Sequence, residues 1–163
     1  MTPTATGQFI QTLEGLKPGD LGQLRKHAGL ALDESVDGFD LFAGLWWPLR
    51  EKNQKAPRRE VAWLIAKLYA FCPMPQSGGA TLASQLGSLK GTDERAAKRR
   101  QQKFDELLSL PLSQIEPALH WALMLIAENG KVLDWVRLTD ELSIWEREEI
   151  RLKWAKQYLR IEP

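Results

Sequence analysis

Basic side chains between residues 90 and 104 are the part of this sequence best suited to bind a ligand. Six Lys or Arg residues and two acidic residues lie there, a local excess of four positive charges in a chain whose formal net charge is +1. Such a density is typical of surfaces that bind nucleic acid, anionic lipid or an acidic protein. A solvated helix surface has the same composition, so both interpretations remain open.

An amphipathic helix over residues 92–110 must position these side chains. At 100° per residue, four of its five basic side chains fall within one arc of roughly 140°, and its apolar side chains lie opposite. The basic arc contains Arg95, Lys98, Arg99 and Lys103. The apolar arc contains Ala97, Phe104, Leu107 and Leu108. Arg100 falls at the edge of the apolar arc, so we expect it to be more buried or better paired than its neighbours.

No arrangement of residues is typical of a catalytic site. The motifs G-x-S-x-G and H-E-x-x-H are absent, and His27 and His120 lie in different predicted helices without a nearby nucleophile. Ten carboxylates and three basic residues lie between residues 105 and 149, but without metal-site spacing. The acidic residues at 33–40 lack the final bidentate Glu of a calcium loop. We therefore expect no enzymatic activity, no cofactor and no metal.

Length and composition indicate a globular protein. The chain has 163 residues, of which 44% are hydrophobic and 26% charged, enough to bury a core. Its longest apolar run, residues 121–127, is too short to cross a bilayer, and residues 1–9 lack signal-peptide features. Cys72 is the only cysteine, which excludes an intramolecular disulfide and predicts a buried thiol. We expect a cytoplasmic protein with no membrane contact.

Helix signals follow one another along the chain and predict an all-α protein of about eight or nine helices in two packed halves. The expected organisation is an N-terminal helical subdomain at 1–76, a linker with a short helix at 77–91 and a C-terminal helical subdomain at 92–163. The helix after Pro57 is apolar almost all round and should be central to the N-terminal half. Core positions expected in the C-terminal half are Ile115, Leu119, Ala122, Leu123, Ile126, Trp145, Ile150, Trp154 and Leu159.

Local signals also predict how three helices begin or end. Thr6 can cap the first helix, and Ser113 with Glu116 three residues later forms a capping-box pattern. Pro48 should kink or end the helix that contains it.

Further basic residues lie in the N-terminal half. Arg25 and Lys26 are on the outward side of the second predicted helix, and residues 50–59 contain five basic residues and one acid. Arg58 and Arg59 occupy the first turn of the central helix, where the helix dipole favours acids, which suggests that these cations have another use.

An ordered series of segments covers residues 103–158. The segments are KFDELLSLPLSQIEPALHWALMLI, LDWVRLTDELSIW and KWAKQYL. Their order, spacing and helical context resemble the CasB family, the small subunit of the type I-E CRISPR surveillance complex Cascade. The N-terminal half is similar more loosely, through QLRK at 23–26 and PRR at 57–59.

This resemblance implies a non-catalytic subunit that is present in two copies beside the other Cascade subunits. The family contacts the R-loop formed by crRNA and target DNA, including its single-stranded DNA, and steadies it. The RNA–DNA duplex of an R-loop is about as stable as the DNA duplex that it replaces, so protein contacts to the strand backbones can shift the equilibrium toward the R-loop. The alternative is a helical protein–protein adaptor that docks onto other subunits and touches no nucleic acid.

The resemblance also points to individual residues. The basic positions of the family pattern fall on Lys103, Arg137 and Lys153, and in the N-terminal half on Arg25 and on Arg58 or Arg59. With the charge analysis, the predicted nucleic-acid-binding residues are Arg25, Lys26, Arg58, Arg59, Arg95, Arg99, Lys103, Arg137 and Lys153. His120 replaces an Arg of the family pattern and is mostly uncharged at neutral pH, so no such role is assigned to it.

Overall fold

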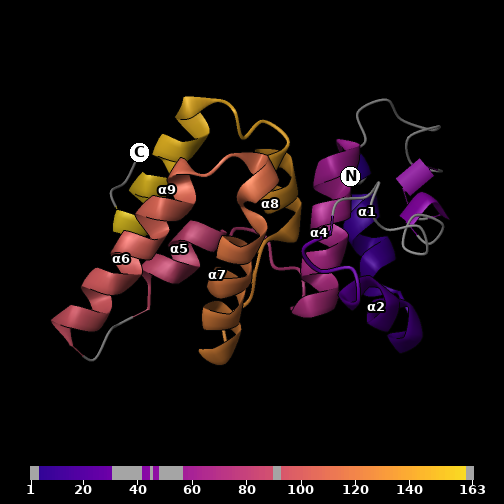
Figure 1. The fold of residues 1–163 in the computed structure, drawn as a ribbon, viewed down its shortest axis with the longest axis horizontal. Helices are drawn as coiled ribbons and strands as arrows, with labels where there is room; N and C mark the ends of the chain where they lie inside the picture. The colour runs from indigo at the N-terminus through magenta and orange to yellow at the C-terminus, as the bar shows by residue number, and fades with distance from the viewer. Residues whose placement is uncertain (1–3, 31–41, 45, 48–56, 90–92, 161–163) are drawn as a thin grey trace.

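The computed structural model describes residues 4–30, 42–44, 46–47, 57–89 and 93–160. Within these ranges the regular elements are helices, and the prediction of an all-α protein is confirmed (Figure 1). They are α1 (Ala5–Glu14), α2 (Pro18–Arg25), α4 (Arg59–Phe71), α5 (Leu82–Gly87), α6 (Glu94–Ser109), the 3-10 helix η2 (Leu112–Gln114), α7 (Glu116–Glu128), α8 (Trp135–Leu142) and α9 (Glu148–Leu159). Residues 42–44 and 46–47 are also helical.

Several predictions concern residues outside these ranges. They are the acidic stretch at 33–40, the proline at 48, the basic residues at 50–55 and Lys90. Among the helices that the structure describes, none combines the length and apolar character needed to cross a membrane.

The helices form two groups that lie side by side (Figure 1). Helices α1, α2 and α4 make up the first group, and α5 to α9 the second. Helix α4 packs on α2 and also on α7 and α8, while α1 packs on α8. Helix α5 packs against α7 and α9, so part of the predicted linker lies within the second group. The subdomain boundaries at 76 and 92 remain a prediction.

Helix α4 is the central helix of the first group, as its apolar sequence predicts. Every side chain from Val61 to Ala70 is buried, including the charged Lys67. A helix buried on all faces needs neighbours on all sides, which α2, α7 and α8 provide together with the helical residues before it. Phe42, for example, meets Trp63 edge-on at 5.5 Å between ring centroids.

Three fully buried tryptophans hold the second group together. The indole N–H groups of Trp135 and Trp145 donate to the carbonyls of Met74 (2.8 Å) and Leu110 (2.9 Å), respectively. That of Trp154 donates to the Glu141 carboxylate at 2.9 Å. Each ring fills the core while its one polar atom finds a partner in another element. All the predicted core positions of this half are buried except one: Leu159 is 53% exposed.

The structure corrects both predicted caps. The side chain of Thr4, not Thr6, caps α1, and the buried Thr6 hydroxyl instead donates to Asp140 on α8 at 2.6 Å. At α7 the N-cap residue is Ile115, without a side-chain cap, and Ser113 lies in η2. At α1 a partner distant in sequence therefore decides how the Thr6 hydroxyl is used.

A buried ion pair fastens the two groups to each other. The Lys67 ammonium on α4 lies 2.7 Å from the Glu116 carboxylate on α7, and it also donates to the Leu30 carbonyl at 2.7 Å. The second carboxylate oxygen of Glu116 accepts the Gly29 N–H at 2.9 Å. Glu116 therefore serves a contact between α2, α4 and α7 and not the predicted capping box.

His120 extends this contact and makes the stability of the fold depend on pH. Its ring stacks on Phe71 at 4.3 Å, and its Nε2 lies 3.6 Å from the Glu116 carboxylate. Burial lowers the pKa of His120 below 6.5; Glu116 opposes this effect and Lys67 adds to it. As the pH falls below 6.5, the unfolded chain therefore takes up the proton first, and the stability that the neutral ring contributes is lost.

We expect the free energy of unfolding to fall more steeply with acidification in the wild-type chain than in the H120Q variant. Urea denaturation from neutral pH to below the folded-state pKa would measure both curves. Other titrating groups are common to the two chains, so parallel curves would show that His120 makes no such contribution.

Candidate nucleic-acid interface

Helix α6 begins with acidic residues that suit its N-terminus. The Asp93 carboxylate caps the helix by accepting the Ala96 N–H at 2.8 Å, and Glu94 lies in the first turn. Both negative charges interact favourably with the positive end of the helix dipole, whereas the Lys and Arg residues of the following turns do not.

Only the C-terminal half of α6 is anchored in the core. The buried side chains of α6 are Phe104 and Leu107, and the Phe104 ring stacks on Tyr158 of α9 with centroids 4.4 Å apart. The N-terminal half extends away from the neighbouring helices, at the left of Figure 1. Most of its side chains are therefore exposed to solvent.

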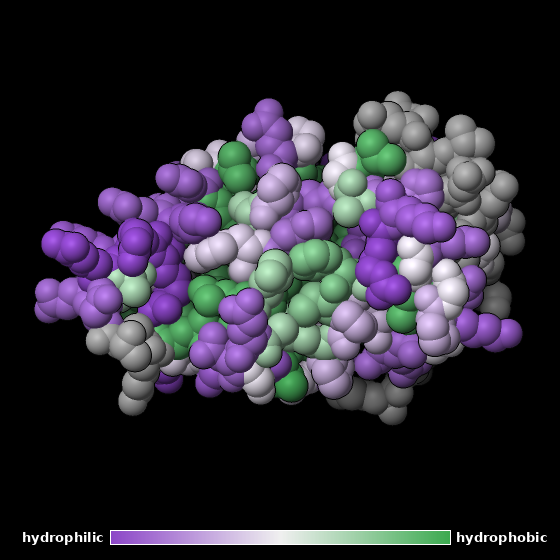
Figure 2. Space-filling model, turned by 60° about the horizontal axis from the view of Figure 1, so that its bottom comes forward, coloured by the Kyte–Doolittle hydropathy of each residue, from purple (hydrophilic) through white to green (hydrophobic). Residues whose placement is uncertain are grey.

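The exposed half carries the predicted cationic face. Arg95, Lys98 and Arg99 are exposed, and none has an ion pair or hydrogen bond with a residue that the structure describes. Lys103 is exposed as well, and its ammonium lies 5.4 Å from the ring centroid of Trp121 on α7. Figure 2 shows hydrophilic side chains crowding this end of the molecule.

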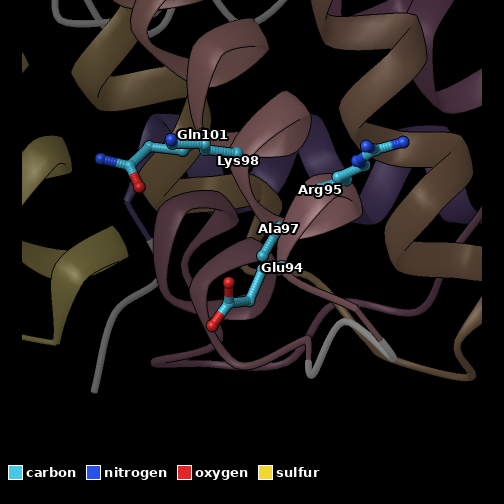
Figure 3. A pocket seen from close by; sticks show the side chains of 5 residues that line it. All are labelled: Glu94, Arg95, Ala97, Lys98 and Gln101. Carbon is cyan, nitrogen blue, oxygen red and sulfur yellow. The ribbon is translucent and has the colours of Figure 1, made fainter.

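Two other expectations for α6 have opposite outcomes. Arg100 is partly buried and donates to the Leu89 carbonyl at 2.9 Å, as expected from its place on the helix. Ala97, which the helical wheel places on the apolar side, is exposed, so the buried part of that side is confined to the C-terminal half of α6. Ala97 lines a shallow hollow with Glu94, Arg95, Lys98 and Gln101 (Figure 3). Since all five come from one helix, the hollow is open surface.

Arg137 and Lys153 converge on a single carboxylate. Arg137 Nε lies 3.7 Å and Lys153 Nζ 3.3 Å from Glu141 Oε2. The other carboxylate oxygen accepts the Trp154 N–H. The two cations thus neutralise a buried acid between α8 and α9, and together the three side chains leave one net positive charge at this surface.

Arg58 is also paired within the protein. Its guanidinium lies 2.9 Å from the Glu146 carboxylate and donates to the Ser143 carbonyl at 3.2 Å. The hydrogen bond from Arg58 is the main reason that the pKa of Glu146 is lowered. Arg58 is the N-cap residue of α4 and not part of its first turn, and this bond to the turn between α8 and α9 gives it a structural use. The neighbouring Arg59 is exposed.

The remaining predicted residues lie on α2 and at its end. Arg25 donates to the Ala70 carbonyl of α4 at 3.3 Å, and Lys26 is exposed at the C-cap of α2. The nine predicted residues therefore form separate groups on α2, at the start of α4, on α6 and across α8 and α9. Among the described residues, Arg25, Lys26 and Arg59 also lack an acidic partner, but α6 holds the largest group of such cations, with Arg95, Arg99 and Lys103 on one helix.

Comparison with known proteins identifies the family. The family described as CRISPR-associated protein Cse2 matches residues 20–159. This chain belongs to the Cse2 family. The resemblance of its sequence to CasB proteins is thereby confirmed.

Solved CasB structures share the fold of this Cse2-family chain. CasB from M. ruber is 22% identical, with a TM-score of 0.75 over 98% of this chain and 94% of the other. CasB from Thermus thermophilus is 25% identical, with a TM-score of 0.67 and 92% of each chain covered. CasB from Thermobifida fusca is 16% identical, with a TM-score of 0.68 over 96% of this chain and 99% of the other. No curated protein sequence matches the chain.

Groups suited to metal or thiol chemistry are the other candidates for a site in the described part of the chain. In the part of the chain that the structure describes, no cluster of three or more His, Cys, Asp and Glu side chains could hold a metal ion. Cys72, expected to be buried, is partly buried at the end of α4. Burial raises the pKa of its thiol, which disfavours the reactive thiolate.

Proposed function

We propose that this Cse2-family protein is the non-catalytic small subunit of a type I-E Cascade complex. In this role it binds nucleic-acid backbone in the R-loop of crRNA and target DNA, including single-stranded DNA, and helps to scaffold the assembly. Its partners are the other Cascade subunits and a second copy of itself. Membership of the Cse2 family supports the assignment to a CRISPR system.

The observation that carries the nucleic-acid role is the exposed face of α6. Arg95, Lys98 and Arg99 lie within two turns and have no acidic partner in the described part of the chain. Cations without an acidic partner can take the place of the counterions condensed on a nucleic acid, and release of those counterions drives binding. Contacts of this kind position the protein on phosphates without reading sequence, as a subunit that serves many guides requires.

The other predicted cations contribute less in this proposal. Arg58 must leave Glu146, and Arg137 and Lys153 must leave the buried Glu141, before they can pair fully with phosphate. Removing both cations from Glu141 would strand a buried charge, which is costly. We therefore rank α6 first, with Lys26 and Arg59 as secondary contacts.

Neutralising the α6 face is expected to weaken binding to single-stranded DNA and to reduce its salt dependence. Each lost phosphate contact lowers the slope of log K against log salt by about 0.7 for a single strand, so the R95Q/K98Q/R99Q variant should lose about 2 units of slope. Fluorescence anisotropy with an oligo-dT probe over a salt series would measure it.

A matched control removes three charges elsewhere. Lys17, Lys131 and Arg147 lie outside α6, and the K17Q/K131Q/R147Q variant should keep the wild-type slope. An equal loss of slope in both variants would show that binding depends on the net charge of the protein and not on the α6 face. If the α6 variant instead keeps its slope but fails to assemble with the other Cascade subunits, the protein acts as an adaptor and the nucleic-acid role is wrong.

A further inference from the structure

Trp121 is placed differently from the three tryptophans of the core. The buried side chains of α7 are Leu119, Ala122, Leu123 and Ile126. Trp121 packs against the core, but on a helical wheel it lies on the opposite side from these four residues. Its ring is partly buried, and its indole N–H has no hydrogen-bond partner among the described residues, unlike those of Trp135, Trp145 and Trp154.

This indole borders the cationic face of α6. The Lys103 ammonium, at the edge of that face, lies 5.4 Å from the Trp121 ring centroid. Arg99 stands one turn before Lys103 on the same helix and is exposed. An aromatic ring beside a row of unpaired cations is the combination by which proteins hold single-stranded nucleic acid, with bases on the ring and phosphates on the cations.

We propose that Trp121 is a stacking platform for an unpaired base and makes the α6 face selective for single-stranded over double-stranded nucleic acid. This inference rests on the proposed function, since the α6 cations must first hold the phosphates. In a duplex each base is stacked on both sides and paired, so a duplex can use the cations but not the indole. A single strand can use both.

The contact with Lys103 does not prevent stacking. A cation over an exposed aromatic ring is worth roughly a two- to fivefold change in an equilibrium constant. Stacking of a base on an aromatic side chain is worth roughly five- to hundredfold. The base therefore displaces the ammonium, and the flexible Lys103 side chain becomes available to a phosphate of the same strand.

Replacing the indole tests the platform directly. Full-length W121L should bind oligo-dT about five- to hundredfold more weakly than the wild type, whereas its affinity for a duplex of equal length should change by less than about twofold. W121F keeps a flat ring and should retain most of the single-strand preference. Trp47, which is 55% exposed in the N-terminal half, provides the matched control W47L, and this variant should bind both probes like the wild type.

Two further measurements separate stacking from other causes. K103Q keeps the indole and should therefore still prefer the single strand; loss of that preference in K103Q would overturn the proposal. Photocrosslinking of the wild-type chain to an iodouracil-substituted strand, mapped by mass spectrometry, should mark residue 121 regardless of how the variants fold. Crosslinks confined to other residues, or equal loss for both probes in W121L, would also overturn it.

Failure of the proposed function and failure of the Trp121 platform give different results. If R95Q/K98Q/R99Q leaves oligo-dT binding and its salt slope unchanged, the nucleic-acid role of α6 itself fails. If that variant behaves as expected and W121L keeps the wild-type preference, only the role of Trp121 fails.

Discussion

The G87A variant is expected to be less stable than the wild-type protein by about 3 kcal/mol, at the upper end of the usual cost of overpacking. Gly87 is the last residue of α5 and faces the backbone of α9. A Cβ atom there would overlap the Tyr158 carbonyl oxygen and lie 2.8 Å from its carbonyl carbon. Backbone atoms cannot rotate away as a side chain would, so α5 and α9 would have to separate.

This separation would also disturb α6, because the ring of Tyr158 stacks on Phe104. Thermal unfolding should show a midpoint lowered by about 6–12 °C, since each kcal/mol shifts a chain of this size by about 2–4 °C. The control is G22A in α2, where the nearest atom is 3.6 Å away and belongs to the Arg25 side chain. That variant should be more stable by about 0.4–1 kcal/mol. A wild-type midpoint for G87A would show that the helices tolerate the methyl group.

Removing the carboxylate in E116A is expected to cost about 3–5 kcal/mol, because it leaves a buried ammonium without its counter-charge. The side chain of Lys67 is only 3% exposed and that of Glu116 13%. After the substitution the Lys67 ammonium would keep the Leu30 carbonyl as its hydrogen-bond partner. The Gly29 N–H would lose its acceptor, which adds to the cost.

A double-mutant cycle tests this explanation. K67M/E116A contains no unpaired buried charge, so it should lose clearly less stability than the sum of K67M and E116A. Urea denaturation would supply the four free energies of unfolding. The comparison pair is Arg58 and Glu146, whose side chains are 44% and 63% exposed, and E146A should cost under about 1 kcal/mol. Additive losses at Lys67 and Glu116 would mean that the two charges act independently.

Much of the fold follows from local patterns that the sequence displays directly. Helical periodicity predicted the central helix α4, the core positions of α7 and the amphipathic α6. The same wheel placed Arg100 apart from its cationic neighbours, and the structure confirms this with its bond to Leu89. Such predictions succeed because side chains three and four residues apart share a helix face wherever the helix lies.

Local patterns could not predict whether another helix packs against a given helix face. The wheel assigned Ala97 to an apolar side, but no helix covers that turn of α6, and it assigned Leu159 to the core, although the structure leaves it exposed. Thr6 and Ser113 are good capping residues, yet Thr6 bonds to Asp140 across the two groups of helices and Ser113 lies in a 3-10 turn.

The candidate site also has features that the sequence predicts and features that only the tertiary structure reveals. Its charge is visible in the sequence, as is the resemblance that led to the family. Which cations remain free is a tertiary property, because Glu141 is 12 residues from Lys153 and Glu146 is 88 residues from Arg58 in sequence. The contact of Lys103 with Trp121 likewise depends on how α6 packs against α7.

The sequence by itself determined the helices, their apolar faces and the concentration of positive charge on α6, since all three depend on residues within a few turns of one another. Only the tertiary structure decided which of the basic residues are neutralised, where an indole borders the cationic face and why α5 must carry a glycine. These features arise where segments distant in the chain meet, and the partner at such a contact is chosen by packing of the whole molecule.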